Sequence, residues 1–309
     1  MVDVEYLQSQ LNDYCDELEV LRNLSKITIK NYRQTNGYFI KYLKENSIDI
    51  EHKPDFVLKK FIVYLKKDKD NRYSTINKYL QQIIQFLRFL DIKVDIQLPK
   101  DNSKNKKIKY LRPEEVNEVL KTIPNELVRD KAIIQTLYRT GLRVSELCNL
   151  KKQNLDINSI DKAIAIYVHE GKGGKDRTVY IDNKTLKLIN TMIYKRSIKN
   201  IVNEEGYLFT NKMGNRLSER SVQKIVKKHA IATDRRLALE GKQTNLKERL
   251  TPHTLRHSFT IFLLNYGNKP INEVQQLLGH SNISTTQIYS KVDDKRIKHS
   301  YENINWDNS

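Results

Sequence analysis

Cysteine, glycine and proline are scarce in this sequence, and each scarcity narrows the class of protein. The 309 residues include only two cysteines, Cys15 and Cys148, which lie far apart and outside any CxxC pair. A cysteine-based zinc site is therefore not expected, whereas a reducing, cytoplasmic setting is. With only 10 glycines and 6 prolines among many helix-forming residues, the chain should be mainly helical.

Long apolar runs are also missing. No stretch approaches the roughly 20 apolar residues that cross a bilayer, and the beginning, MVDVEYLQSQ, is too acidic and polar for a signal peptide. No internal repeat is present, and no cluster of carboxylates accompanies the basic residues as a metal nuclease would require. We therefore expect neither a membrane partner nor a metal.

Positive charge, by contrast, is abundant and unevenly placed. Lysine and arginine number 55 against 37 aspartates and glutamates, a net charge of +18. Residues 1–100 hold 17 basic against 14 acidic side chains, so most of the surplus lies after residue 100. Such a surplus favours a polyanionic partner, nucleic acid first and an anionic membrane second. A solubility bias or a lysine-rich genome is the alternative explanation.

The first 98 residues predict a compact bundle of four helices. Apolar residues recur at helical spacing over 4–22, after Ser25, after Pro54 and after Ser74. Ser25 and Ser74 are typical N-caps, and Pro54 is typical of a first helical position. Residues 99–111 lose this periodicity and are rich in lysine, which predicts a linker. Its Lys104, Lys106 and Lys107 suit a phosphate backbone, although a solvated loop explains them almost equally well.

Residues 112–309 predict a second, α+β domain. Helices are expected over 113–123, 125–140, 183–199, 218–231 and most of 252–303, and Gly141 should end the second of them. Residues 163–169 and 177–181 alternate as strands around the turn GKGGKD, which predicts a β-hairpin. The chain should therefore be mainly α, with one small β-hairpin.

Four segments of this second domain carry residues suited to one chemistry. They are TGLRVSEL, GKGGKDRTV, TPHTLRHSF and LLGHSNISTTQIYS, in that order. Together they resemble the tyrosine recombinase, or phage integrase, family across residues 112–303, and residues 1–98 resemble its core-binding domain more weakly. The resemblance implies a site-specific DNA recombinase. Its catalytic residues would be Arg143, Lys172, His253, Arg256, His280 and Tyr289.

The two arginines fit the main task of this chemistry, which is to neutralise the extra negative charge of a phosphorane. A guanidinium is always charged and binds oxygens as a fork. Glu146 lies three residues after Arg143, close enough on a helix to hold its side chain. A plain surface ion pair between Arg143 and Glu146 is the alternative.

His253 and Arg256 are also three residues apart and share a helix face beside a helix N-terminus, which favours phosphate. A zinc site at His253 and His257 is a weak alternative, because further ligands are missing; His257 is expected to play a supporting role. In the family, the position of His280 hydrogen-bonds the scissile phosphate, although a C-cap histidine would look the same.

Tyr289 is the expected nucleophile, and a pocket with arginines and histidines would stabilise its phenolate. Only its distance from His280 separates it from the other 16 of the 17 tyrosines. Lys172, in the hairpin turn, is the expected general acid for the departing 5′ oxygen. Lys175 and Arg177 are its rivals, and their alternative role is to contact DNA phosphates.

The resemblance further implies a homo-tetramer on two double-stranded DNA sites, a 3′-phosphotyrosyl intermediate, a Holliday junction and no cofactor. Accessory DNA-binding or partner recombinase proteins remain open, as does the choice among integration, excision, inversion and dimer resolution. The chain shows no extra arm-binding domain, which favours an Xer-like or transposon-type member. A non-catalytic DNA-binding protein of the same fold and a strand-passing topoisomerase are the alternatives. Residues 232–250 are longer and more charged than the connection that the family usually has before the helix at PHTLRH. This segment is expected to be an insertion, an extra DNA contact or a mobile loop.

Overall fold

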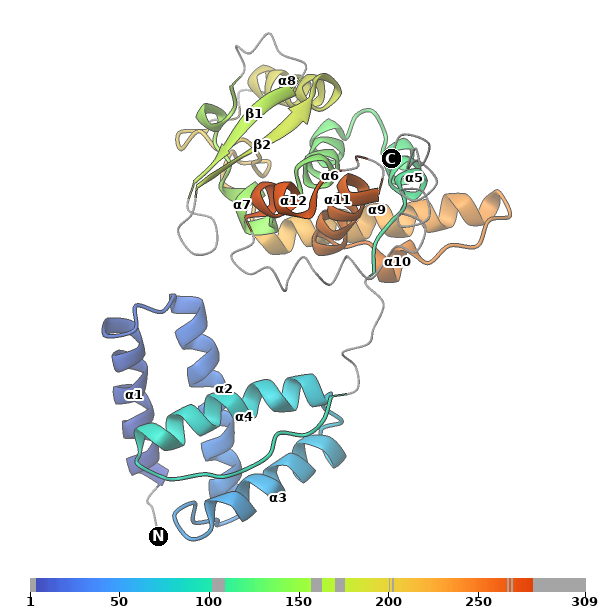
Figure 1. The fold of residues 1–309 in the computed structure, drawn as a ribbon. Coiled ribbons are helices and arrows are strands. Elements are labelled where there is room, and N and C mark those ends of the chain that lie inside the picture. Colours follow the sequence, from blue (N-terminus) through green and yellow to red (C-terminus); the bar gives the residue numbers. More distant parts are fainter. Residues whose placement is uncertain are drawn as a thin grey trace, which may run out of the picture. The chain divides into compact units, whose positions relative to one another are not determined.

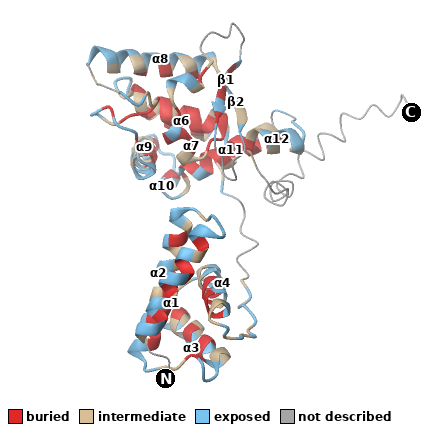
Figure 2. Cartoon of the chain, turned by 90° about the vertical axis from the view of Figure 1, so that its left-hand side faces the viewer, coloured by how far each residue is buried: buried red, intermediate tan, exposed pale blue. Residues whose placement is uncertain are grey.

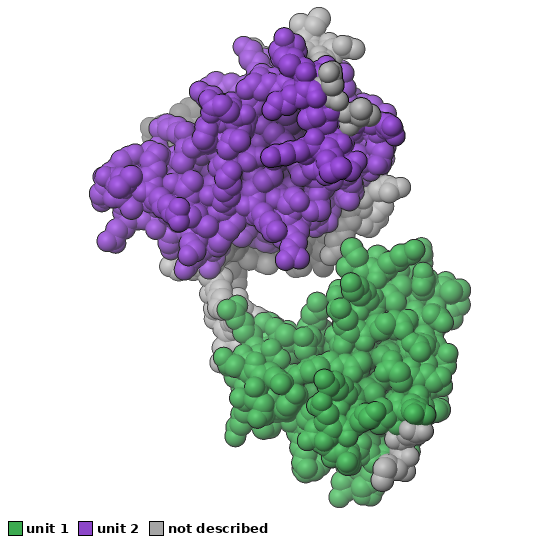
Figure 3. All heavy atoms as spheres, turned by 180° about the vertical axis from the view of Figure 1, so that it is seen from behind, with its two compact units in different colours: residues 1–106 green, residues 107–309 purple. Residues whose placement is uncertain are grey.

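The computed structural model describes residues 4–101, 109–156, 163–169, 176–199, 201, 203–265, 267 and 269–279. The chain divides into two compact units, residues 1–106 and residues 107–309 (Figure 3). The division falls within the segment 99–111, where the sequence predicted a linker. Each unit has its own hydrophobic core.

The first unit contains the four expected helices (Figure 1). They are α1 (Val4–Val20), α2 (Lys26–Glu45), α3 (Pro54–Lys67) and α4 (Tyr73–Phe89). Ser25 caps α2 as predicted, since its hydroxyl accepts the Thr28 N–H at 3.3 Å. The predicted cap at Ser74 is wrong. Helix α4 already begins at Tyr73, because Arg72 has the extended backbone of an N-cap residue.

The core of this first unit is aromatic at its centre. Helix α2 packs against α1 and α4, and α3 packs against α4. The ring of Phe61 from α3 lies 5.0 Å from that of Phe39 and 4.9 Å from that of Tyr42, centroid to centroid. Figure 2 shows the buried residues on the inward faces of these helices. The unit is therefore a helical bundle held by large apolar side chains.

The second unit is built around one buried helix, α6 (Val128–Thr140), which contacts α8, α9, α11 and β2. Figure 1 shows α8 on one side of α6 and α9 on the other. The remaining helices of this unit are α5 (Pro113–Thr122), α7 (Val144–Asn149), the 3₁₀ turn η2 (Lys152–Asn154), α8 (Asn183–Ile198), α9 (Glu219–Leu239), α10 (Leu246–Arg249), α11 (Pro252–Asn265) and α12 (Ile271–Leu278).

The predicted β-hairpin is present. Strands β1 (Ala163–Val168) and β2 (Arg177–Asp182) pair antiparallel, with Ala163 opposite Asp182 and Val168 opposite Arg177. Every second residue of β1 is buried, and α8 contacts both strands. The hairpin therefore has one covered face, as the alternating pattern predicted. Its turn, with Lys172 and Lys175, lies outside the described residues.

One expectation about the second unit needs correction. The charged segment 232–250 is largely helical: α9 continues to Leu239, and the Asp234 carboxylate accepts the backbone N–H groups of Leu246 and Lys247 at the start of α10. The helical region expected over most of 252–303 starts with two helices, since α11 ends at Asn265 and α12 covers Ile271–Leu278. Residues 280–303 lie outside the described part. Among the described helices, none is long and apolar enough to cross a membrane.

Candidate active site

The site begins where α6 ends. Gly141 has φ +61 and donates its N–H to the Leu137 carbonyl at 3.1 Å, a left-handed C-cap of the kind predicted. A Cβ at this position would overlap the ring of Phe259 from α11. Glycine therefore permits both the backbone conformation and the close approach of α11, and the chain turns directly into α7.

Arg143 is the N-cap residue of α7, and Glu146 holds it twice. The Glu146 carboxylate accepts the Arg143 backbone N–H at 2.7 Å and its Nη1 at 2.8 Å. The Arg143 side chain is still 25% exposed. The structure thus joins these two residues as their spacing suggested, and it leaves part of the Arg143 side chain exposed.

Glu146 has a second cationic partner, Arg177 at the start of β2. Arg177 donates Nη1 to Oε1 at 2.9 Å and Nη2 to Oε2 at 2.6 Å. Burial alone would raise the pKa of Glu146, but the bonds and charges of Arg177 and Arg143 outweigh it and lower that pKa to about 2. The buried carboxylate is therefore ionised at neutral pH.

The position of Arg177 differs from the sequence-based prediction, which made this residue a contact to DNA phosphates. Its side chain is only 7% exposed and is engaged inside the protein. The sequence offered no signal for this role, because Glu146 lies 31 residues away.

Arg256 lies in the second turn of α11 and is 5% exposed. It donates Nη1 to the Gly141 carbonyl at 2.5 Å and Nη2 to the Leu278 carbonyl at 2.6 Å. Both carbonyls stand at helix C-termini, where the helix dipole favours a cation. Arg256 therefore ties the ends of α6 and α12 to α11, beside Arg143.

His253 lies in the first turn of the same helix, with an exposed side chain. Partial desolvation, and then the positive charges of Arg256 and Arg143, lower its pKa. The two nearby positive charges and the partial burial therefore disfavour the protonated imidazole. The ring of His257 packs edge-on against it, with centroids 4.2 Å apart.

A basic hollow of about 480 Å³ adjoins His253. Its lining includes Arg220, Lys224 and Lys227, which project from α9 at spacings of four and three residues and so share a helix face. These cations were not among the predicted DNA contacts, although that spacing was a signal that could have identified them.

Seven predicted site residues lie outside the described part: Lys104, Lys106, Lys107, Lys172, Lys175, His280 and Tyr289. The described residues that flank two of their segments lie at the site. Arg177 follows the hairpin turn and binds Glu146, and Gly279 immediately precedes His280. The Gly279 carbonyl lies 3.5 Å from Arg143 Nη2. The structure therefore assembles Arg143, Glu146, His253, Arg256 and His257.

Comparison with known proteins agrees with this arrangement. The phage integrase family profile matches residues 109–296, more than half of the chain. The chain is 34% identical over 302 residues to tyrosine recombinase XerA of Pyrococcus furiosus, covering 96% of this chain and 93% of that protein. It is 32% identical to tyrosine recombinase XerC of Natranaerobius thermophilus, covering 96% of this chain and 98% of that one.

Solved structures share the fold at lower identity. A XerH site-specific recombinase bound to a palindromic difH substrate matches with a TM-score of 0.70 and 21% identity, over 96% of this chain and 84% of that one. The Tn1549 transposon integrase bound to circular intermediate DNA matches with a TM-score of 0.68 and 20% identity, over 96% and 98%. The predicted resemblance and the fold class are confirmed. The chain belongs to the phage integrase family of tyrosine recombinases, enzymes that cleave and rejoin DNA.

Proposed function

We propose that this recombinase cleaves each DNA strand with Tyr289 and holds the DNA through a 3′-phosphotyrosyl bond. The observation that carries the proposal is the convergence of two arginines that are anchored independently, Arg143 by a carboxylate and Arg256 by two helix-terminal carbonyls. Both arginines lie close to His253, whose lowered pKa favours the neutral imidazole. This arrangement suits a phosphodiester that gains negative charge in its transition state.

The arginines and His253 have separate tasks in this reaction. Arg143 and Arg256 would bind the non-bridging oxygens of the scissile phosphate and stabilise the phosphorane. A neutral imidazole can accept the Tyr289 proton or hydrogen-bond the phosphate, and the lowered pKa of His253 favours that neutral form. Glu146 would orient Arg143, and His257 would support the ring of His253.

The remaining steps belong to Tyr289, Lys172 and His280. The Tyr289 oxygen attacks phosphorus, the P–O5′ bond breaks, and Lys172 donates a proton to the leaving 5′ oxygen. His280 would donate a hydrogen bond to the phosphate. A 5′-hydroxyl of a second duplex then attacks the phosphotyrosyl bond and releases Tyr289. Because the covalent link conserves the bond energy, the cycle needs neither ATP nor a metal.

DNA binding would use both units. Residues 1–98 and 112–309 would clamp double-stranded DNA, with Lys104, Lys106, Lys107 and Lys175 on its phosphates. The basic face of α9 supports a further contact, because Arg220, Lys224 and Lys227 line the hollow beside His253. A phosphate held at the catalytic arginines would bring neighbouring backbone to this face.

The assembly that we propose is a homo-tetramer on two DNA sites, which exchanges strands in two rounds through a Holliday junction. Integration, excision and dimer resolution all use this chemistry, and accessory or partner recombinases would select among them. We place the reaction in the cytoplasm, because Cys15 and Cys148 are free, buried thiols that suit a reducing compartment.

The test is a covalent-adduct assay. Purified protein is mixed with DNA that carries the sequences flanking its own gene, including a nicked duplex that traps the intermediate, and is analysed on a denaturing gel. The wild type should form a protein–DNA adduct, and Tyr289→Phe should form none while binding the same DNA. Tyr194→Phe, at an exposed tyrosine of α8, is the matched control and should react like the wild type. An adduct that persists in Tyr289→Phe would overturn the assignment of the nucleophile.

A further inference from the structure

Three parts of the catalytic unit meet at one side chain, that of Arg177. Its guanidinium donates Nη1 and Nη2 to the two oxygens of Glu146 on α7, and its Nε to the Leu277 carbonyl of α12 at 3.0 Å. Arg177 itself opens β2, directly after the hairpin turn that contains Lys172. One residue therefore joins the hairpin, the helix α7 that Arg143 caps, and the helix α12 that precedes His280 in the sequence.

The packing around Arg177 leaves it little freedom. The side chain is 7% exposed, and its planar fork matches the carboxylate of Glu146. A Cβ on Gly279 would stand only 3.0 Å from the Arg177 Cδ, so α12 ends in a residue without a side chain where the two meet. The contacts on three elements and this close approach indicate one defined position for the guanidinium.

The charge of Arg177 also affects Arg143. Glu146 binds both guanidiniums, at 2.6 Å to Arg177 Nη2 and 2.8 Å to Arg143 Nη1. Without Arg177, the whole negative charge of Glu146 would act on Arg143 and would weaken its attraction for a phosphate. Arg177 thus neutralises most of the negative charge of Glu146, so the positive charge of Arg143 remains available to attract a phosphate.

We propose that Arg177 is a positioning residue for strand cleavage, which holds Glu146 and the end of α12 so that Arg143 faces the scissile phosphate. This inference rests on the proposed function of Arg143. Arg177 touches neither DNA nor the reacting atoms, and its effect passes through its neighbours. Its loss should slow the chemical step while DNA affinity is nearly preserved.

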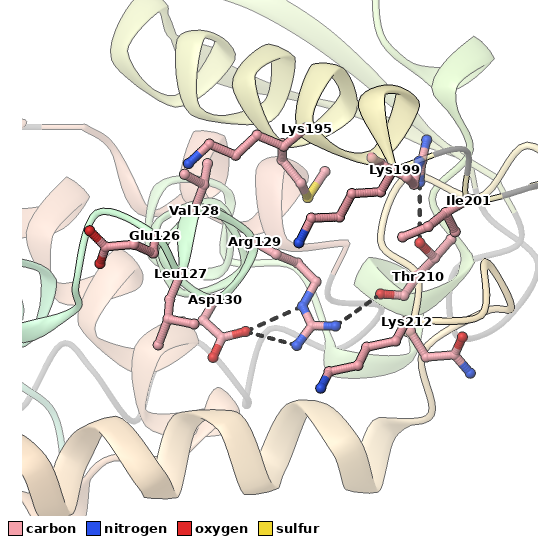
Figure 4. Close-up of a pocket in the computed structure, with 13 residues that line it drawn as sticks. Glu126, Leu127, Val128, Arg129, Asp130, Lys195, Lys199, Ile201, Thr210 and Lys212 are labelled. Carbon is pink, nitrogen blue, oxygen red and sulfur yellow. Dashed lines mark hydrogen bonds and ion pairs between the residues drawn. The ribbon is translucent and has the colours of Figure 1, made fainter.

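A matched control exists at the opposite end of α6. Arg129 likewise pairs with a buried carboxylate, donating Nε and Nη2 to Asp130 at 3.2 and 3.0 Å and Nη1 to the Thr210 carbonyl (Figure 4). The 13 residues of α6 separate this cluster from the site by roughly 20 Å. Arg129→Gln therefore disturbs a similar ion pair without touching the catalytic arginines.

The experiment measures single-turnover adduct formation at saturating protein, DNA affinity by gel shift, and thermal unfolding. Arg177→Gln should cleave about 100-fold more slowly, the scale of a misplaced catalytic group, with affinity within about threefold of the wild type. Arg177→Lys keeps the charge but not the planar fork, so its cleavage rate should lie between those of Arg177→Gln and the wild type. This variant also tests the inference if Arg177→Gln does not fold. Arg129→Gln should cleave like the wild type.

A second substrate separates positioning from general damage. A methylphosphonate at the scissile position removes one negative charge, so its cleavage should depend less on Arg143 and hence less on Arg177. The decrease in rate caused by Arg177→Lys should be several-fold smaller on this substrate. Equal decreases on both substrates, or wild-type cleavage by both Arg177 variants, would overturn the inference. A wild type that forms no Tyr289-dependent adduct would instead refute the proposed function.

Discussion

At the scale of single residues, the two arginines that we propose to be catalytic differ in how they are anchored. Arg143 is 25% exposed and forms an ion pair with the Glu146 carboxylate, whereas Arg256 is 5% exposed and donates hydrogen bonds to two main-chain carbonyls. Removing Arg143 leaves Glu146 with Arg177 as a partner. Removing Arg256 takes the guanidinium donor away from the two buried helix ends.

Arg143→Ala and Arg256→Ala should therefore both abolish cleavage but differ in stability. We expect Arg143→Ala to unfold near the wild-type temperature. Arg256→Ala should lose about 1–3 kcal/mol, the cost of a buried polar group left without a partner. Adduct formation, gel shift and thermal unfolding measure the three effects. Binding that falls in proportion to cleavage would contradict the catalytic assignment of either residue.

Glu146 should make stability depend on acid pH. Its folded-state pKa of about 2 lies below the ordinary value of 4.5, so its contribution is present above pH 4.5 and is lost as pH falls toward 2. The loss is on the order of 3 kcal/mol at full protonation.

Urea unfolding of the wild type and Glu146→Gln, at several values between pH 6 and pH 2, measures this contribution. The wild type should be the more stable at pH 6, and the difference should shrink as the pH falls. A difference that stays constant with pH would show that the carboxylate is not held ionised by Arg177 and Arg143.

At the scale of elements, the junction of α6 with α7 and α11 decides the geometry of the site. Gly141 ends α6, accepts a bond from Arg256 and lies against Phe259. A side chain at this glycine would push α11 away from α6. Because Arg256 and His253 belong to α11, they would move with it.

Gly141→Ala should therefore destabilise the second unit by about 2–4 kcal/mol, from left-handed strain plus overpacking. Cleavage should fall further than DNA affinity does. Gly241→Ala is the control, because Gly241 has φ +74 but no atom within 4 Å of an added Cβ. It should cost only about 1 kcal/mol and leave cleavage unchanged. Equal effects of the two substitutions on unfolding would contradict the role of the Phe259 contact.

At the scale of the whole molecule, the net charge of +18 matters mostly through where the cations lie. Helix α9 carries Arg220, Lys224 and Lys227 beside His253. Helix α8 lies on the other side of α6 (Figures 1 and 2), and its Lys184, Lys187 and Lys195 are exposed. If the α9 cations contact DNA phosphates, replacing them should change how DNA affinity depends on salt, and replacing the α8 lysines should not.

Replacing Arg220, Lys224 and Lys227 together by glutamine should lower the slope of log K against log salt by about 0.9 for each DNA phosphate that the variant no longer binds. The control replaces Lys184, Lys187 and Lys195 of α8, which removes the same charge and should change the slope little. Gel shifts over a range of salt concentrations measure both slopes. An equal change in the two variants would mean that net charge alone, and not the α9 face, governs binding.

The sequence predicted the helices and the hairpin because their signals are local: apolar periodicity, caps and turn residues act within a few positions. The same reasoning placed Arg143 beside Glu146 and His253 beside Arg256, at helical spacing. It failed for Ser74, where the helix begins one residue earlier, and for 232–250, where Asp234 organises a charged segment into the ends of α9 and α10.

What the sequence alone determined is the family, because the four short segments that resemble a tyrosine recombinase are recognised by residue identity and order. What only the tertiary structure decided is which buried charges meet. Arg177 binds Glu146 across 31 residues, and Arg256 reaches a carbonyl 115 residues away. A buried charge must find a partner, and the packing of distant elements selects that partner, so no local pattern could have indicated it.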